Sequence, residues 1–113
     1  MKFNHYYKEL GLTGHDFPFE KDEDKEGFSE TEFFNLDYSL ALYIYGRLRY
    51  FQDHCLVGSP SDMTFEQWSN IINKMIKGFY LYLAEDYKLS KNKEKQMRYG
   101  MKLFIKYFSG LWY

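Results

Sequence analysis

The clearest chemical signal in this 113-residue sequence is a row of basic side chains in its last quarter. Its members are Lys91, Lys95, Arg98, Lys102 and Lys106. Spacings of 4, 3, 4 and 4 residues place all five within roughly 80° of arc on an α-helix. Like charges this close repel one another, which favours a partner of opposite charge. The row therefore predicts a binding face for phosphate groups or for an acidic protein surface. A solvated face, or docking on the chain's own acidic segment, is the alternative.

That acidic segment is the second candidate binding region. Its carboxylates are Glu20, Asp22, Glu23, Asp24 and Glu26. Residues 1–40 carry four Lys against ten Asp and Glu, whereas residues 88–113 carry seven basic groups against Glu94 alone. The net charge of −1 thus hides a gradient along the chain. Such a segment can imitate nucleic-acid phosphates toward a basic groove.

Two charged residues, Asp37 and Arg47, fall within an apolar stripe, where a lone charge is costly. They are ten residues apart, about 15 Å along a helix, so they cannot pair with each other. Arg47 is within reach of Asp86 on a neighbouring helix. We predict structural ion pairs at Asp37, Arg47 and Asp86, with an active-site constellation as the alternative.

Patterns for metal binding and catalysis are incomplete. The acidic residues from Asp22 to Glu26 resemble the opening of an EF-hand loop, but Phe33 stands where the closing glutamate belongs. His54 and Cys55 lack the second ligand pair of a zinc site. The sequence contains neither a Gly-rich phosphate loop nor a recognisable Ser/His/Asp order. We therefore predict no metal, no cofactor and no enzymatic activity.

One catalytic pattern is kept as an alternative. Arg49 and His54 match the arginine–four–histidine spacing of the HEPN helical ribonucleases, which this chain also resembles in size. The resemblance implies a dimer in which Arg49 and His54 act on RNA phosphate.

The composition is typical of one globular domain. Hydrophobic residues make up 45% of the chain and aromatic residues 22%, too much for a disordered protein. The single cysteine, Cys55, cannot form an intrachain disulfide, which is typical of a reducing cytoplasm. The first residues lack the apolar run of a signal peptide. The longest uncharged apolar stretch, Tyr38 to Gly46, is about half as long as a bilayer crossing. We expect a soluble cytoplasmic protein that does not bind membranes.

Hydrophobic periodicity predicts three long helices in a small all-α bundle. An irregular acidic N-terminal arm, residues 1–28, precedes a helical domain, residues 29–113. The first helix is expected to begin at Ser29, which forms a capping box with Glu32, and to end near His54. Its expected core stripe is Leu36, Leu40, Ile44, Leu48 and Phe51. The opposite side carries Tyr38, Leu42, Tyr45 and Tyr50. A helix that is apolar on both sides is expected to be central to the domain or to a homodimer.

The second and third helices have clearer limits. A capping box of Thr64 and Gln67 starts the second helix, and the third starts near Ser90. The second has the cleanest stripe: Phe65, Trp68, Ile71, Ile72, Met75, Ile76, Phe79 and Leu83. The third shares one face among Met97, Gly100, Met101, Phe104, Phe108 and Leu111. Gly100 costs about 1 kcal/mol of helix propensity, which predicts a compensating close approach of two helices.

These helices resemble a group of short phage and prophage proteins that have no assigned function. The resemblance covers roughly residues 29–112 and rests on Leu36-Asp37, Arg47-Leu48, Phe51, Trp68, Met75-Ile76, Phe79, the run from Gly100 to Phe108, and Leu111-Trp112. It implies a bacteriophage origin and a helical fold, and it implies no activity.

Together these observations predict a phage-encoded, non-enzymatic binding protein in the cytoplasm of an infected bacterium. The specific hypothesis is an inhibitor of a bacterial defence system, of the anti-CRISPR kind, whose partner is a host protein or a protein–nucleic-acid complex. One alternative is a sponge that sequesters a cyclic-nucleotide signal between aromatic faces and basic groups. The others are the HEPN-like ribonuclease and a virion-assembly or replication accessory protein.

Overall fold

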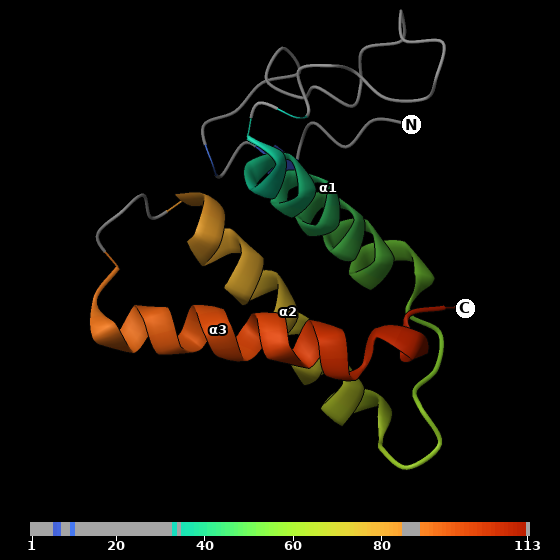
Figure 1. The fold of residues 1–113 in the computed structure, drawn as a ribbon. Coiled ribbons are helices and arrows are strands. Elements are labelled where there is room, and N and C mark those ends of the chain that lie inside the picture. Colours follow the sequence, from blue (N-terminus) through green and yellow to red (C-terminus); the bar gives the residue numbers. More distant parts are fainter. Residues whose placement is uncertain (1–5, 8–9, 11–32, 34, 85–88, 113) are drawn as a thin grey trace, which may run out of the picture.

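The computed structural model describes residues 6–7, 10, 33, 35–84 and 89–112. Three α-helices make up most of these ranges: α1 (Leu36–Tyr50), α2 (Phe65–Ala84) and α3 (Lys91–Lys106). A π-helical turn, η5 (Phe51–Cys55), extends α1, and a 3-10 turn, η6 (Phe108–Gly110), follows α3. The described ranges contain no strand, so the prediction of a small all-α bundle is confirmed (Figure 1).

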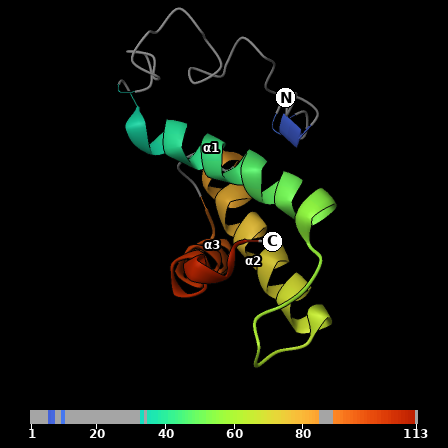
Figure 2. The same ribbon diagram turned by 90° about the vertical axis from the view of Figure 1, so that its right-hand side faces the viewer.

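The central helix is α2, because both α1 and α3 pack against it. Figures 1 and 2 show that α1 and α3 each cross α2. The Tyr80 ring contacts the Tyr45 ring of α1, with centroids 6.3 Å apart, while Phe79 packs edge-to-face on Phe104 of α3. The structure therefore places α2, and not the first helix, at the centre of the described domain. α2 takes that place because it has apolar contacts on two sides. The alternative expectation, that the first helix is central to a homodimer, stays a prediction.

A pair of glycines sets the spacing between α2 and α3. A Cβ built on Gly100 would lie 2.8 Å from the Cα of Gly78, and one built on Gly78 would lie 2.9 Å from the Cα of Gly100. Real Cβ atoms essentially never approach so closely. The close helix approach that Gly100 predicted is confirmed, and its partner Gly78 was not expected.

The starts of α2 and α3 are fixed by local hydrogen bonds. Thr64 and Gln67 form the predicted capping box: the Gln67 amide donates to Thr64 Oγ1 at 3.0 Å, and the Thr64 amide donates to Gln67 Oε1 at 2.9 Å. Ser90 Oγ accepts from the backbone amide of Lys93 at 3.2 Å. Both predicted starts are confirmed.

The start of α1 differs from the prediction. The helix begins at Leu36 and not at Ser29, because Asn35 has a non-helical backbone, with φ −137° and ψ 74°. The expected capping box of Ser29 and Glu32 lies outside the described residues. At the other end, η5 carries the helix to Cys55, next to the expected end near His54.

The predicted core stripe of α1 is partly correct. Leu48 is buried, and Ile44 and Phe51 are partly buried and pack against the core. Leu36 and Leu40 are 45% and 52% exposed, whereas Leu42 and Tyr45, expected on the opposite side, are 0% and 1% exposed. The apolar residues of α1 are distributed all around the helix. Hydrophobic periodicity therefore could not indicate which side the neighbouring elements would cover.

Two tyrosines from the N-terminal arm cover α1 on a second side. The Tyr7 hydroxyl donates to the backbone oxygen of Leu42 at 2.5 Å, and its ring lies directly against Gly46. The Tyr6 hydroxyl donates to the Asp53 carboxylate at 3.0 Å. Both tyrosines are buried. Residues 11–32 of the arm, including its acidic carboxylates, lie outside the described residues.

Candidate functional site

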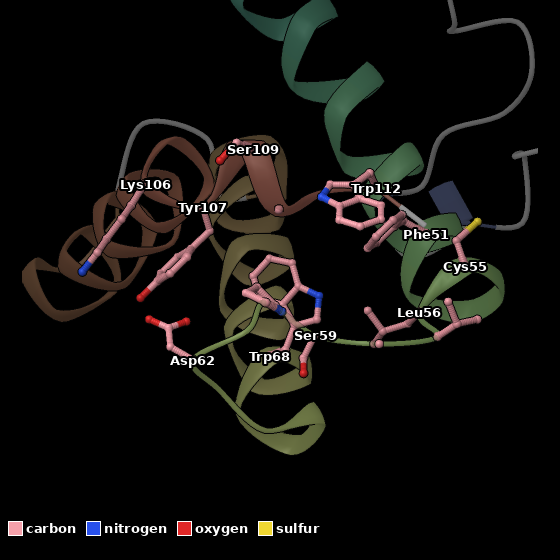
Figure 3. A pocket seen from close by; sticks show the side chains of 14 residues that line it. Phe51, Cys55, Leu56, Ser59, Asp62, Trp68, Lys106, Tyr107, Ser109 and Trp112 are labelled. Carbon is pink, nitrogen blue, oxygen red and sulfur yellow. The ribbon is translucent and has the colours of Figure 1, made fainter.

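A hollow of about 380 Å³ lies where the loop before α2, the end of α1 and the end of α3 meet (Figure 3). We call it the tryptophan pocket, after Trp68 and Trp112, which both line it. Its size falls in the range of about 300–1,000 Å³ that is usual for small-molecule sites.

Local hydrogen bonds position the walls of this pocket. In the loop, the Met63 amide donates to the Pro60 oxygen at 3.2 Å, and Ser59 Oγ donates to the Met63 oxygen at 2.9 Å. In η6, the Gly110 amide donates to the Tyr107 oxygen at 2.9 Å. Gly110 lies directly against the Trp68 ring, so the segment after α3 is held against α2. The walls therefore come from ordered turns on two sides.

One end of the tryptophan pocket is polar. Asp62, Tyr107 and Lys106 lie there together, and the Tyr107 hydroxyl points toward the Asp62 carboxylate (Figure 3). The Lys106 Nζ lies 5.3 Å from the centroid of the Tyr107 ring. Among the described residues, Lys106 and Asp62 do not form an ion pair with each other. This end thus presents a cation and an anion that do not neutralise each other directly.

The other end is apolar. Trp112 stands over Phe51, and Leu56 lies below them (Figure 3). Trp68 occupies the middle as a buried floor, 2% exposed, with its ring edge-on to Tyr107 at 6.0 Å. Trp112 is 75% exposed and is therefore available to cover a ligand. Aromatic walls of this kind suit a flat or bulky apolar group.

The predicted basic row lies on the outer side of α3. All five members, Lys91, Lys95, Arg98, Lys102 and Lys106, are exposed. Arg98 forms an ion pair with Glu94 at 3.0 Å, one helical turn away. Tyr99 and Ile105, 51% and 75% exposed, stand among the cations. We call these seven residues together the α3 face, and Lys106 joins it to the tryptophan pocket.

The charged residues of α1 have aromatic partners. Asp37 is exposed and accepts a hydrogen bond from the Tyr82 hydroxyl, which lowers the pKa of the Asp37 carboxyl and raises that of Tyr82. Asp37 thus has a neutral donor where a cation was expected. The Arg47 guanidinium lies over the Tyr43 ring, with its Cζ 3.7 Å from the ring centroid. Its expected partner Asp86 lies outside the described residues, so that ion pair stays a prediction.

The two residues of the ribonuclease pattern are engaged by different aromatic rings. Arg49 donates to the Tyr45 hydroxyl at 2.8 Å and lies over the Tyr6 ring. The exposed His54 packs on the Tyr50 ring, with centroids 4.4 Å apart. The change to π-helix at η5 falls between Arg49 and His54 and alters their register from that of a continuous α-helix.

A second, apolar groove of about 280 Å³ lies between α1 and the end of α3. Ile44, Arg47, Phe108 and Leu111 are among its walls, and Phe51 lines both this groove and the tryptophan pocket. The groove was not predicted, because the spacing of apolar residues assigns this side of α1 to the core. The tryptophan pocket was not predicted either, because its walls come from three separate segments of the chain.

The described residues thus form a small helical fold with an open pocket lined by two tryptophans and a basic face on the outer side of α3. The chain matches no protein-family model, no curated protein and no solved structure. The resemblance to short phage proteins therefore stays a prediction.

Two further properties concern the described residues alone. None of their helices is both long enough and apolar enough to cross a membrane. Nor do they contain a group of three or more His, Cys, Asp or Glu side chains that could hold a metal ion.

Proposed function

We propose that this is a non-enzymatic binding protein and that the α3 face is its contact surface for an acidic region of a partner protein. The observation that carries the proposal is the mixed character of that face. Five cations and the exposed side chains of Tyr99 and Ile105 share one side of a 16-residue helix. Contacts with a phosphate backbone need only the cations, whereas exposed aromatic and apolar side chains beside them are typical of protein interfaces.

The helix that carries this face is rigidly placed. The backbone contact of Gly100 with Gly78 and the Phe104 ring on Phe79 hold its inner side against α2. The outer side of α3 is therefore already ordered before a partner binds, which lowers the entropy lost on binding.

The biological role that we propose is inhibition of a bacterial defence system by a phage protein. It rests on the resemblance to short phage proteins, and the α3 face supplies the surface that such a role needs. The partner would be a host protein or a protein–nucleic-acid complex, met in the cytoplasm of the infected cell.

The experiment is to express the protein in bacteria that carry one defined defence system each and to count plaques of a sensitive phage. Restored plaque formation in one strain supports the role, and purification of tagged protein from that strain should recover a component of its defence system. The interaction should weaken with rising salt, because the contacts are charged.

A pair of charge-reversal variants tests the face itself. Lys102→Glu alters the middle of the α3 face, and Lys77→Glu makes the same change of charge at an exposed position on α2. We expect Lys102→Glu to abolish restoration and Lys77→Glu to preserve it. Equal effects of the two variants, or recovery of only capsid or replication proteins, would contradict the proposal.

A further inference from the structure

We propose that the tryptophan pocket binds a free α-amino acid with a large apolar side chain, as the zwitterion. This ligand follows from the arrangement of the pocket and does not depend on the α3 face having a protein partner.

The polar end fits the charged groups of an amino acid. Asp62 and Lys106 stand at the same end of the pocket, on the loop before α2 and on the last turn of α3, and are not ion-paired with each other. A ligand that carries an ammonium and a carboxylate on one carbon can meet both, its ammonium at Asp62 and its carboxylate at Lys106. Charge-assisted hydrogen bonds of this kind are about twice as strong as neutral ones. The Tyr107 hydroxyl is a further polar group beside them (Figure 3).

The apolar end fits a large side chain. Phe51, Leu56 and Trp112 line that end, and Trp68 forms the floor between the two ends. Trp112 has most of its ring exposed, so covering a bound apolar group removes ring surface from water as well as ligand surface. A small amino acid such as alanine would leave this end empty.

The same arrangement disfavours a nucleotide. Phosphate at Lys106 would bring two negative charges beside the Asp62 carboxylate, which repels them. A nucleotide also carries polar groups at both ends, whereas the charged side chains of the pocket, Asp62 and Lys106, stand at one end only. Nucleotide binding is therefore the outcome that would contradict the proposal most directly.

The test uses L-phenylalanine. Its side chain does not absorb at the wavelengths that excite tryptophan selectively, so tryptophan fluorescence can report on binding. We expect a saturable change in fluorescence and a matching isotherm in titration calorimetry. Two relatives isolate the charges: 3-phenylpropionate lacks the ammonium, and 2-phenylethylamine lacks the carboxylate. Each should bind about tenfold more weakly or worse, because one charged hydrogen bond is lost. L-alanine should bind more weakly still, and AMP should give no saturable signal.

Variants assign each charge to its residue. Asp62→Asn should remove the preference for L-phenylalanine over 3-phenylpropionate, and Lys106→Gln should remove the preference over 2-phenylethylamine. Lys77→Gln, on α2 and outside both the pocket and the α3 face, is the matched control and should bind as the unaltered protein does. Asp62 and Lys106 are exposed, so these changes should leave the helical circular dichroism unchanged.

Three results would overturn the proposal. The first is no saturable signal with L-phenylalanine up to about 10 mM. The second is equal binding of L-phenylalanine and 3-phenylpropionate by the unaltered protein. The third is tighter binding of AMP than of L-phenylalanine, strengthened by Asp62→Asn, which would make the site a nucleotide site.

Discussion

Gly78 of α2 and Gly100 of α3 meet backbone to backbone, with room for no side chain between them. The atoms that a Cβ on Gly100 would strike are the Cα and amide nitrogen of Gly78 and the backbone oxygen of Lys74. Backbone atoms cannot turn aside as the end of a long side chain can. The two helices are therefore locked at this distance as long as both residues are glycine.

Gly100→Ala should destabilise the protein by about 2 kcal/mol in urea unfolding, because forcing a methyl against backbone atoms costs about 3 kcal/mol, the upper end of the usual range. The clash outweighs the gain of about 1 kcal/mol that alanine brings inside a helix. Gly58→Ala is the control, since nothing lies within 4 Å of its Cβ position, and it should change stability little. A Gly100→Ala protein as stable as the unaltered one would show that the helices are not in backbone contact.

The Tyr6 hydroxyl should make stability depend on alkaline pH. Burial, reinforced by the hydrogen bond to Asp53, raises the pKa of Tyr6 from 10.0 to about 12. Because the folded pKa lies above the unfolded one, this contribution is complete below pH 10 and is lost as the pH rises toward 12. Urea midpoints measured from pH 8 to 12 should fall more steeply for the unaltered protein than for Tyr6→Phe. Identical slopes would mean that Tyr6 ionises as freely in the folded chain as in the unfolded one.

The hydrogen bond between Tyr82 and Asp37 should make the stability of the protein depend on acidic pH. The hydrogen bond from Tyr82 lowers the pKa of the Asp37 carboxyl, so its contribution is present above the unfolded pKa and is lost as the pH falls through the folded one. In Tyr82→Phe, an NMR titration should find the Asp37 pKa raised back toward its ordinary value. An unchanged Asp37 pKa in that variant would remove the hydrogen bond as the cause.

The capping box at the start of α2 should be measurable by a conservative pair of variants. Thr64→Ala leaves the Gln67 amide without its side-chain acceptor and should cost about 1 kcal/mol of unfolding free energy. Thr64→Ser keeps the oxygen and should cost much less. Equal losses in thermal or urea unfolding would assign the effect to the Thr64 methyl and not to the cap.

The homodimer stays a prediction, and the outer side of α1 is the surface that now favours it. Leu36, Leu40 and Tyr43 form an exposed apolar row there, beside the groove that Phe108 and Leu111 line. Self-association would cover this row, so Leu40→Glu should shift the mass in light scattering from dimer to monomer. A monomeric mass for the unaltered protein at tens of micromolar would refute the prediction.

The features that could be predicted from the sequence are those determined by residues close together in the chain. α2 has apolar residues on one side and polar ones, among them Asn73 and Lys77, on the other, so most of its buried face could be predicted. Phe65 of the predicted stripe is exposed, and Leu81, outside that stripe, is buried. The caps at Thr64 and Ser90 act within three residues of themselves. Gly100 also gave a correct prediction, because a glycine inside a helix is costly unless a neighbour comes close.

The buried side of α1 could not be predicted in this way, because apolar residues are distributed all around that helix. Leu36 and Leu40 have the spacing of a core stripe, yet the residues buried are Leu42 and Tyr45. Leu42 lies in one core cluster with Tyr7, which is 35 residues away in the chain and donates to the Leu42 backbone oxygen. No pattern within α1 contains that information.

The amino-acid sequence by itself determined that the chain is helical, where α2 and α3 begin and that α3 exposes a row of cations, since each of these follows from neighbours within a turn or two of helix. Only the tertiary structure decided which side of α1 is buried, that Gly100 meets Gly78, and that Asp62, Trp68 and Trp112 wall one pocket. These outcomes depend on contacts between segments far apart in the chain, and local periodicity carries no record of them.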